Sequence, residues 1–241
     1  MLNWLRPKPA CPIDPADREW IDARWQWLEG EFGTQRLRQA SMILPTAEFF
    51  PDPFHGTEEH ARRELDRLCG YTSIDPAMVE LSFFKDRNPF CIDEGNFWAA
   101  GLYDQQGRRF RVCLEEGQLD DPLATITTIA HELGHLLLLG QGRITEGTED
   151  HEPLTDLLTV YLGLGVLMAN SAVREFDNDV AGWSMYGVGY LGMQHFGYAL
   201  ARFAYSRGED GSTWMKELRL DVRSAFKQSM RYLQADVVKT G

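Results

Sequence analysis

Residues 122–140 read PLATITTIAHELGHLLLLG, an apolar stretch with helix-boundary residues at both ends. Asp121 before it is a favourable N-cap, the proline fits the first helical position, and Gly140 ends the apolar pattern. The stretch therefore predicts one helix of about five turns. One side of this helix gathers large apolar side chains, namely Ile126, Ile129, Leu133, Leu136 and Leu137.

The sequence HELGH occupies positions 131–135, on the other side of the predicted helix. His131 and His135 are four residues apart, so both imidazoles share one helical face and can bind one metal ion. These donors suit zinc, and Glu132 can then act as a general base toward water at the metal. Without a metal, a core helix would need a separate buried partner for each of the three side chains, which disfavours that alternative.

Catalytic zinc is usually held by three protein ligands, so a third ligand is expected downstream. Residues 145–153 are acidic and turn-like, and a second apolar helix is predicted over 153–170. Glu152 and Asp156 are four residues apart and share a face. Gly163 continues that face, and we expect it to allow close approach to the first helix.

HELGH followed by EPLTD (152–156) resembles the gluzincin metallopeptidases, in which HExxH is followed by ExxxD on the next active-site helix. The resemblance implies that His131, His135 and Glu152 are zinc ligands and that Glu132 is the catalytic base. It also implies that Asp156 holds a ligand histidine through its other ring nitrogen. HELGHLLLLG, EPLTDLLTVYLGLGVLMANSA and FGYALARFAYSRGE also look like an uncharacterised bacterial zincin-like family, over most of the chain and with no known activity.

One feature departs from the gluzincin pattern. Pro153 directly follows Glu152, and a residue before proline avoids helical backbone angles, so Glu152 is predicted to be an N-cap. His151 is the alternative third ligand, with Glu146 and Glu149 as weaker candidates. Glu152 is favoured because pairing it with Asp156 explains two residues at once, although helix N-termini favour carboxylates in any case.

The expected fold is α+β and predominantly helical, a zincin-like fold with a small sheet before the HExxH helix and a second active-site helix after it. Strands are predicted at 78–84, 97–103 and 109–115, with a hairpin turn at 104–107. In zincins an edge strand lies along the cleft, and either 97–103 or 109–115 is expected there, where a substrate peptide could extend the sheet.

With 241 residues, the chain is predicted to form a single zincin-like domain, 1–241. Within it, 1–70 is interpreted as an N-terminal helical extension and 71–241 as the metal-binding core with the C-terminal helices. Further helices are expected at 14–32, 57–69 (capped by Thr57 and ended by Gly70), 193–207 and 213–234.

Metallopeptidases usually stabilise the developing oxyanion with a Tyr or His donor besides the metal. Tyr190 and His195 are the candidates, because they lie in and just after a glycine-rich loop at 181–192. The alternative is that these aromatic side chains pack the C-terminal helices.

The net charge of −12 argues against nucleic acid and anionic membranes as partners. The first residues lack a secretory signal pattern, which predicts a cytoplasmic protein with reduced thiols. Cys113 alternates with apolar neighbours and is expected in the core, whereas Cys11 or Cys91 could in principle bridge and silence a zinc site.

The leading hypothesis is a zinc-dependent hydrolase, a metallopeptidase that acts on a peptide or protein. The alternative is a catalytically silent zincin-fold protein that binds Zn²⁺ and has a regulatory or interaction role. A deformylase-like amidase is disfavoured, because neither Cys91 nor Cys113 lies in the required motif. The pattern specifies neither the substrate nor the oligomeric state.

Overall fold

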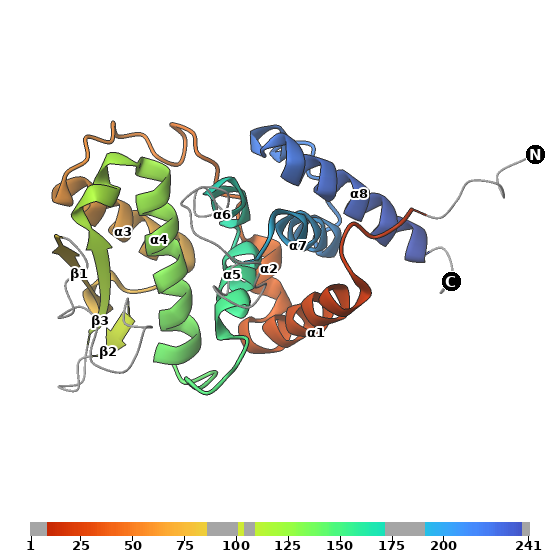
Figure 1. Ribbon diagram of the computed structural model, residues 1–241, viewed down its shortest axis with the longest axis horizontal. Helices are drawn as coiled ribbons and strands as arrows, with labels where there is room; N and C mark the ends of the chain where they lie inside the picture. Colours follow the sequence, from red (N-terminus) through yellow and green to blue (C-terminus); the bar gives the residue numbers. More distant parts are fainter. Residues whose placement is uncertain (1–8, 86–100, 104–108, 172–190, 238–241) are drawn as a thin grey trace, which may run out of the picture.

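The computed structural model describes residues 9–85, 101–103, 109–171 and 191–237. In this part of the chain the protein is predominantly helical and has a small sheet (Figure 1). The helices are α1 (Pro15–Phe32), α2 (Thr34–Gln39), α3 (Glu58–Thr72), α4 (Pro122–His135), α5 (His151–Tyr161), α6 (Gly165–Ser171), α7 (Met193–Ser206) and α8 (Leu220–Val237). The strands are β1 (Val79–Phe84), β2 (Gly101–Tyr103) and β3 (Phe110–Glu115), and short 3₁₀ turns lie at Pro76–Met78, Glu116–Asp120 and Met215–Glu217.

The sheet has the order β1-β3-β2. β1 runs parallel to β3, with Val79 opposite Phe110, and β2 runs antiparallel to β3, with Tyr103 opposite Phe110. The three predicted strand regions are thus confirmed where they are described, whereas 97–100 and the predicted turn at 104–107 lie outside the described residues. Of the two candidates for the edge strand, 109–115 was wrong, because β3 pairs on both sides.

Helix α4 lies in the middle of the fold, between the sheet with α3 on one side and α5 with α6 on the other (Figure 1). Its apolar side chains Ile129 and Leu133 are fully buried, and on the opposite side of the helix Thr127 and His131 are each only 5% exposed. The sequence predicted one face anchored in the core and an opposite face that carries the histidines; the structure buries both faces, so that this helix is covered almost all the way round.

The hydrophobic core is continuous from α1 to α8 across the described residues. Trp25 of α1 packs edge-on against Tyr161 of α5, with ring centroids 5.3 Å apart, and both side chains are fully buried. The first helix therefore packs directly against the helix that carries Glu152.

Three of the predicted helices have different ends in the structure. The last, predicted at 213–234, is α8 and begins only at Leu220, after the 3₁₀ turn at Met215–Glu217. Thr57 caps α3 as expected, but the helix continues past Gly70 to Thr72 and is followed by the C-cap residue Ser73, whose φ of 57° is left-handed. The predicted helix at 153–170 is two helices, because Gly163 has a φ of 91° between α5 and α6.

Gly163 also faces a different neighbour from the one predicted. A Cβ atom at this position would lie 2.1 Å from the carbonyl oxygen of Ser41, and the Gly163 carbonyl accepts a hydrogen bond from the Ile43 amide at 2.8 Å. The prediction that Gly163 allows close approach to the HExxH helix was therefore wrong; its missing side chain makes room for the 41–43 segment.

The helical segment Pro122–Gly140 is long and apolar enough to cross a membrane by length and composition alone. However, 72% of its apolar window is buried inside the protein, as expected of a core helix in a folded domain. This single segment is therefore weak evidence for a membrane span.

Candidate metal centre

The HExxH helix begins where the sequence predicted. One carboxylate oxygen of Asp121 accepts hydrogen bonds from the amides of Leu123 and Ala124, at 3.1 and 3.2 Å, and so caps α4. After His135 the helix continues as a π-helical turn over Leu136–Gly140. Such turns are rare and occur often at functional sites, and this one directly follows the second histidine of the motif.

Helices α4 and α5 approach each other closely at Gly134. A Cβ atom there would lie only 2.7 Å from the Thr155 methyl carbon and 3.8 Å from that of Thr159. The glycine of HELGH thus has the role that the sequence analysis assigned to Gly163. The close approach brings the histidines of α4 opposite the first turn of α5.

Helix α5 is anchored at its start by α1. Asp150, the N-cap residue, accepts two hydrogen bonds from the Arg24 guanidinium, both at 2.6 Å, and one from the Trp20 indole at 2.7 Å. Glu152 lies inside the first turn, so its prediction as an N-cap was wrong. Pro153 is tolerated next to it because amides of the first turn have no acceptor within the helix.

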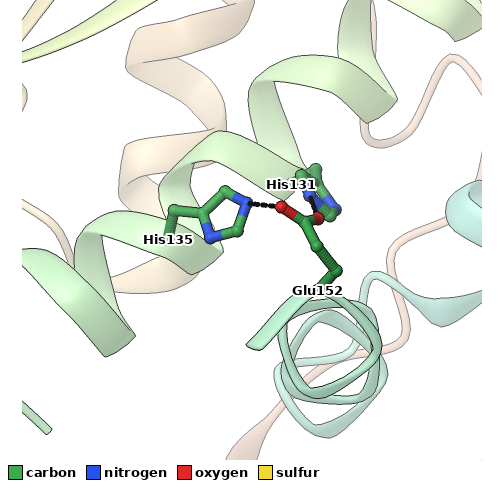
Figure 2. A group of neighbouring side chains, drawn as sticks. All are labelled: His131, His135 and Glu152. Atoms are coloured by element: carbon green, nitrogen blue, oxygen red, sulfur yellow. Dashed lines mark hydrogen bonds and ion pairs between the residues drawn. The ribbon is translucent and has the colours of Figure 1, made fainter. Parts of the chain in front are cut away.

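His131, His135 and Glu152 converge, as Figure 2 shows, with imidazoles from α4 facing a carboxylate from α5. Glu152 Oε2 lies 2.9 Å from His131 Nε2, and Glu152 Oε1 lies 3.3 Å from His135 Nε2. One ligand atom from each residue lies within 4.8 Å of the other two. The three residues are buried, and together they could hold a metal ion.

The other ring nitrogen of each histidine contacts α5. His131 Nδ1 lies 2.9 Å from Asp156 Oδ1, as the gluzincin pattern implies, and Asp156 Oδ2 accepts a hydrogen bond from the Leu191 amide at 2.9 Å. His135 Nδ1 lies 3.2 Å from the Thr155 hydroxyl. The contacts of Thr155 and Leu191 were not predicted, although Thr155 stands directly beside Asp156 in the sequence.

The chemistry of these donors fits a bound cation. When Asp156 and Thr155 accept hydrogen bonds from the Nδ1–H groups, each Nε2 atom carries a lone pair directed at the Glu152 carboxylate. Two lone pairs and an anion at such distances repel one another unless a proton or a metal ion lies between them. Two histidines and one carboxylate are also the ligand set of one class of catalytic zinc sites.

The histidines and carboxylates of the cluster shift one another's pKa values. Burial opposes the charged form of His131, but its hydrogen bonds to Asp156 and Glu152 raise the pKa of the imidazole well above its usual value. Burial likewise opposes ionisation of Glu152, but hydrogen bonds from His131 and His135 hold the pKa of that carboxyl far below its usual range. The cluster therefore favours a positive charge beside an ionised carboxylate.

Glu132 has a different environment. It is buried, and burial raises the pKa of its carboxyl despite the nearby histidines. Its Oε2 atom has no hydrogen-bond partner within the part of the chain that the structure describes. A buried carboxylate oxygen beside a group of candidate metal ligands is suited to accept a proton from a water molecule.

His151 borders the cluster without joining it. Its Nδ1 donates to the Thr148 carbonyl at 2.8 Å, and its Nε2 lies 3.4 Å from Glu152 Oε1. It is absent from the group of mutually close ligand atoms, which favours Glu152 over His151 as third ligand. Glu146 and Glu149 are exposed and are likewise absent from that group.

The two predicted oxyanion donors are not brought to the cluster by any described contact. Tyr190 lies outside the described residues. His195, at the start of α7, has its Nε2 atom 2.9 Å from Asp17 Oδ2 on α1. A catalytic role for either residue stays a prediction.

The cysteines do not contribute to the described cluster. Cys11 and Cys69 are free thiols, and Cys113 is buried in the core as predicted, with its Sγ atom 3.1 Å from the Ser82 hydroxyl. Cys11 is not among the grouped ligands, and Cys91 lies outside the described residues.

No protein-family model, curated protein or solved structure matches this chain. The resemblance to gluzincins therefore rests on the motif residues and on the geometry they adopt. Function has to be argued from the site itself.

Proposed function

We propose that this protein is a zinc-dependent hydrolase with a zincin-like fold, and that it cleaves peptide bonds in a peptide or protein substrate. The observation that carries the proposal is the convergence of His131, His135 and Glu152 next to Glu132, whose buried Oε2 has no hydrogen-bond partner in the described residues. The order of elements supports the fold assignment: a small sheet, the HExxH helix, then the helix with the glutamate.

The ligand set favours zinc over other metals. Two imidazoles and one carboxylate suit zinc, whereas magnesium and calcium prefer oxygen ligands alone. A zinc ion held by these three residues would supply Lewis acidity and would lower the pKa of water.

The residues of the chain then have separate tasks. Glu132 accepts a proton from the attacking water and passes it to the leaving amine. Asp156 keeps the imidazole of His131 oriented by accepting a hydrogen bond from its Nδ1 atom. An extended substrate could pair with an edge of the sheet that precedes α4, because peptides commonly bind as an added strand.

The test compares Glu132→Gln with the wild type. We expect the variant to keep about one zinc per chain, measured by elemental mass spectrometry, because Glu132 is not a ligand. Cleavage of a peptide library should fall by about 100-fold or more, because the amide cannot accept the proton. Glu149→Gln, the same change at an exposed position, is the matched control and should leave both quantities unchanged. Full activity of Glu132→Gln would exclude the mechanism.

Glu152→Ala tests the third ligand in the same assay. Clear loss of zinc is expected, because two histidines alone hold zinc weakly. Retained zinc would indicate that the third ligand is His151, whose Nε2 lies 3.4 Å from Glu152 Oε1.

Burial of the cluster favours one alternative, a catalytically silent zinc protein with a regulatory or interaction role. His131, His135 and Glu152 are between 5% and 9% exposed, which resembles a closed structural site. The alternative predicts one zinc per wild-type chain and no cleavage of any peptide in the library. The hydrolase predicts zinc together with cleavage that depends on Glu132.

A further inference from the structure

We infer that Thr155 is a positioning residue for the metal centre, and that its hydroxyl orients His135 as Asp156 orients His131. The inference rests on the proposed metal centre and adds a residue that the HExxH and ExxxD motifs do not include. Thr155 is fully buried on α5, and its Oγ1 atom lies 3.2 Å from His135 Nδ1.

The direction of the hydrogen bond follows from the second partner of the hydroxyl. Thr155 Oγ1 lies 2.7 Å from the His151 carbonyl oxygen, which can only accept, so the single hydroxyl proton is donated there. Toward His135 the oxygen must then accept, and the proton of that bond belongs to the imidazole Nδ1. With its proton on Nδ1, His135 has the Nε2 lone pair free to bind a metal.

The methyl group of Thr155 has a second role. It packs into the space left by Gly134, where a Cβ atom would lie 2.7 Å from the Thr155 methyl carbon. The hydroxyl and the methyl group thus project from one β-carbon, one toward the ligand histidine and the other toward the helix that carries it. Thr155 can therefore be tested by removing either group separately.

An ordinary helical threonine offers the competing explanation. Threonine hydroxyls often bond a carbonyl one turn back within their own helix, as the Thr72 hydroxyl does here with the Leu68 carbonyl. Thr159, one turn further along α5, is also fully buried and its hydroxyl bonds the Asp156 carbonyl at 2.6 Å. Its methyl also faces Gly134, at a longer 3.8 Å, which makes Thr159 a matched control on the same helix.

The experiment uses the full chain with three substitutions: Thr155→Val, Thr155→Ser and Thr159→Val. Valine keeps the shape and removes the hydroxyl, whereas serine keeps the hydroxyl and removes the methyl. Zinc affinity is measured by competition with a chromogenic chelator, and thermal unfolding is followed in the metal-free proteins. The visible spectrum of the cobalt-substituted proteins reports the geometry of the ligands.

We expect Thr155→Val to weaken zinc binding about 10- to 100-fold, the usual effect of losing a hydrogen bond to a ligand histidine. Its cobalt spectrum should also shift. Thr155→Ser and Thr159→Val should bind zinc within about threefold of the wild type, since a change of that size is below 1 kcal/mol. Thr155→Ser should instead lower the unfolding temperature, because the methyl contact with Gly134 is lost.

Two results would overturn the inference. Wild-type zinc affinity in Thr155→Val would show that the hydroxyl does not act on His135. Equal losses of affinity in Thr155→Val and Thr159→Val would assign the effect to the helix as a whole. In both cases the proposed function stands, whereas a wild-type protein that binds no zinc would remove the proposed function as well.

Discussion

Two of the imidazole–carboxylate pairs among the described residues have the same separation and different surroundings. His131 Nδ1 and Asp156 Oδ1 are 2.9 Å apart, as are His195 Nε2 and Asp17 Oδ2. The side chains of the first pair are 7% and 1% exposed, and those of the second 30% and 45%. Breaking a buried pair leaves a desolvated charge or donor, whereas an exposed pair is screened and exchanges its partner for water. Equal distances therefore do not imply equal importance.

The two carboxylates also differ in what they connect. Asp156 contacts the ligand histidine of α4 with one oxygen and the Leu191 amide with the other. It thus joins α4, α5 and the residues that enter α7, beside the candidate ligand group of His131, His135 and Glu152. The contact between Asp17 and His195 joins α1 to α7. Only the first pair is placed to affect both folding and metal binding.

The largest effect is expected for Asp156→Ala. His131 Nδ1 and the buried Leu191 amide would both lose their acceptor, so we expect the free energy of unfolding to fall by about 3–5 kcal/mol. Urea denaturation of the metal-free protein measures this loss. Asp156→Asn, which keeps the size and one carbonyl oxygen, should unfold at a higher urea concentration than the alanine variant. Its zinc affinity should still be about 10- to 100-fold below the wild type. A loss under about 1 kcal/mol in Asp156→Ala would mean that the buried pair contributes no more to the free energy of unfolding than the exposed pair does.

A smaller effect is expected for Gly134→Ala, which tests how closely α4 and α5 pack around the buried pair. The new Cβ atom would meet the Thr155 methyl at 2.7 Å. Overpacking of this kind costs about 1–3 kcal/mol, more than the gain of up to about 1 kcal/mol in helix propensity. Gly30→Ala is the matched control, because Gly30 is also helical and has nothing within 4 Å of the added atom. Thermal unfolding should show Gly134→Ala below the wild type and Gly30→Ala at or above it. If both substitutions stabilised the protein, α4 and α5 could move apart at Gly134 without a loss in the free energy of unfolding.

Local sequence signals predicted the parts of the site that lie within one helix. The cap at Asp121 and the spacing of His131 and His135 depend only on neighbours a few residues away. Asp156 was also predicted, because the gluzincin pattern places a carboxylate four residues after the ligand glutamate. These features are confirmed as geometry, whereas hydrolysis itself stays a prediction.

Contacts between distant segments could not be predicted from the same signals. The break at Gly163 is set by the approach of Ser41, more than a hundred residues earlier in the chain. The role of Thr155 depends on how α4 and α5 cross, and that crossing depends on Gly134. His195 was predicted from its place after a glycine-rich loop, but its partner is 178 residues away on α1. Periodicity specifies which residues share a face, but not which face of another helix they meet.

The smallest effect is expected for Asp17→Asn. The pair with His195 is partly exposed, so the free energy of unfolding should change by less than about 1 kcal/mol. Zinc affinity should match the wild type, because no described contact links the pair to His131, His135 or Glu152. Both quantities are measured beside Asp156→Asn, the same chemical change at the buried pair. If Asp17→Asn instead abolished peptide cleavage while zinc affinity and stability were unchanged, His195 would act on the substrate, as its position after the glycine-rich loop predicts. The exposed pair of Asp17 and His195 would then belong to the catalytic site. In that site the buried pair would serve metal binding, and the exposed pair would serve substrate binding.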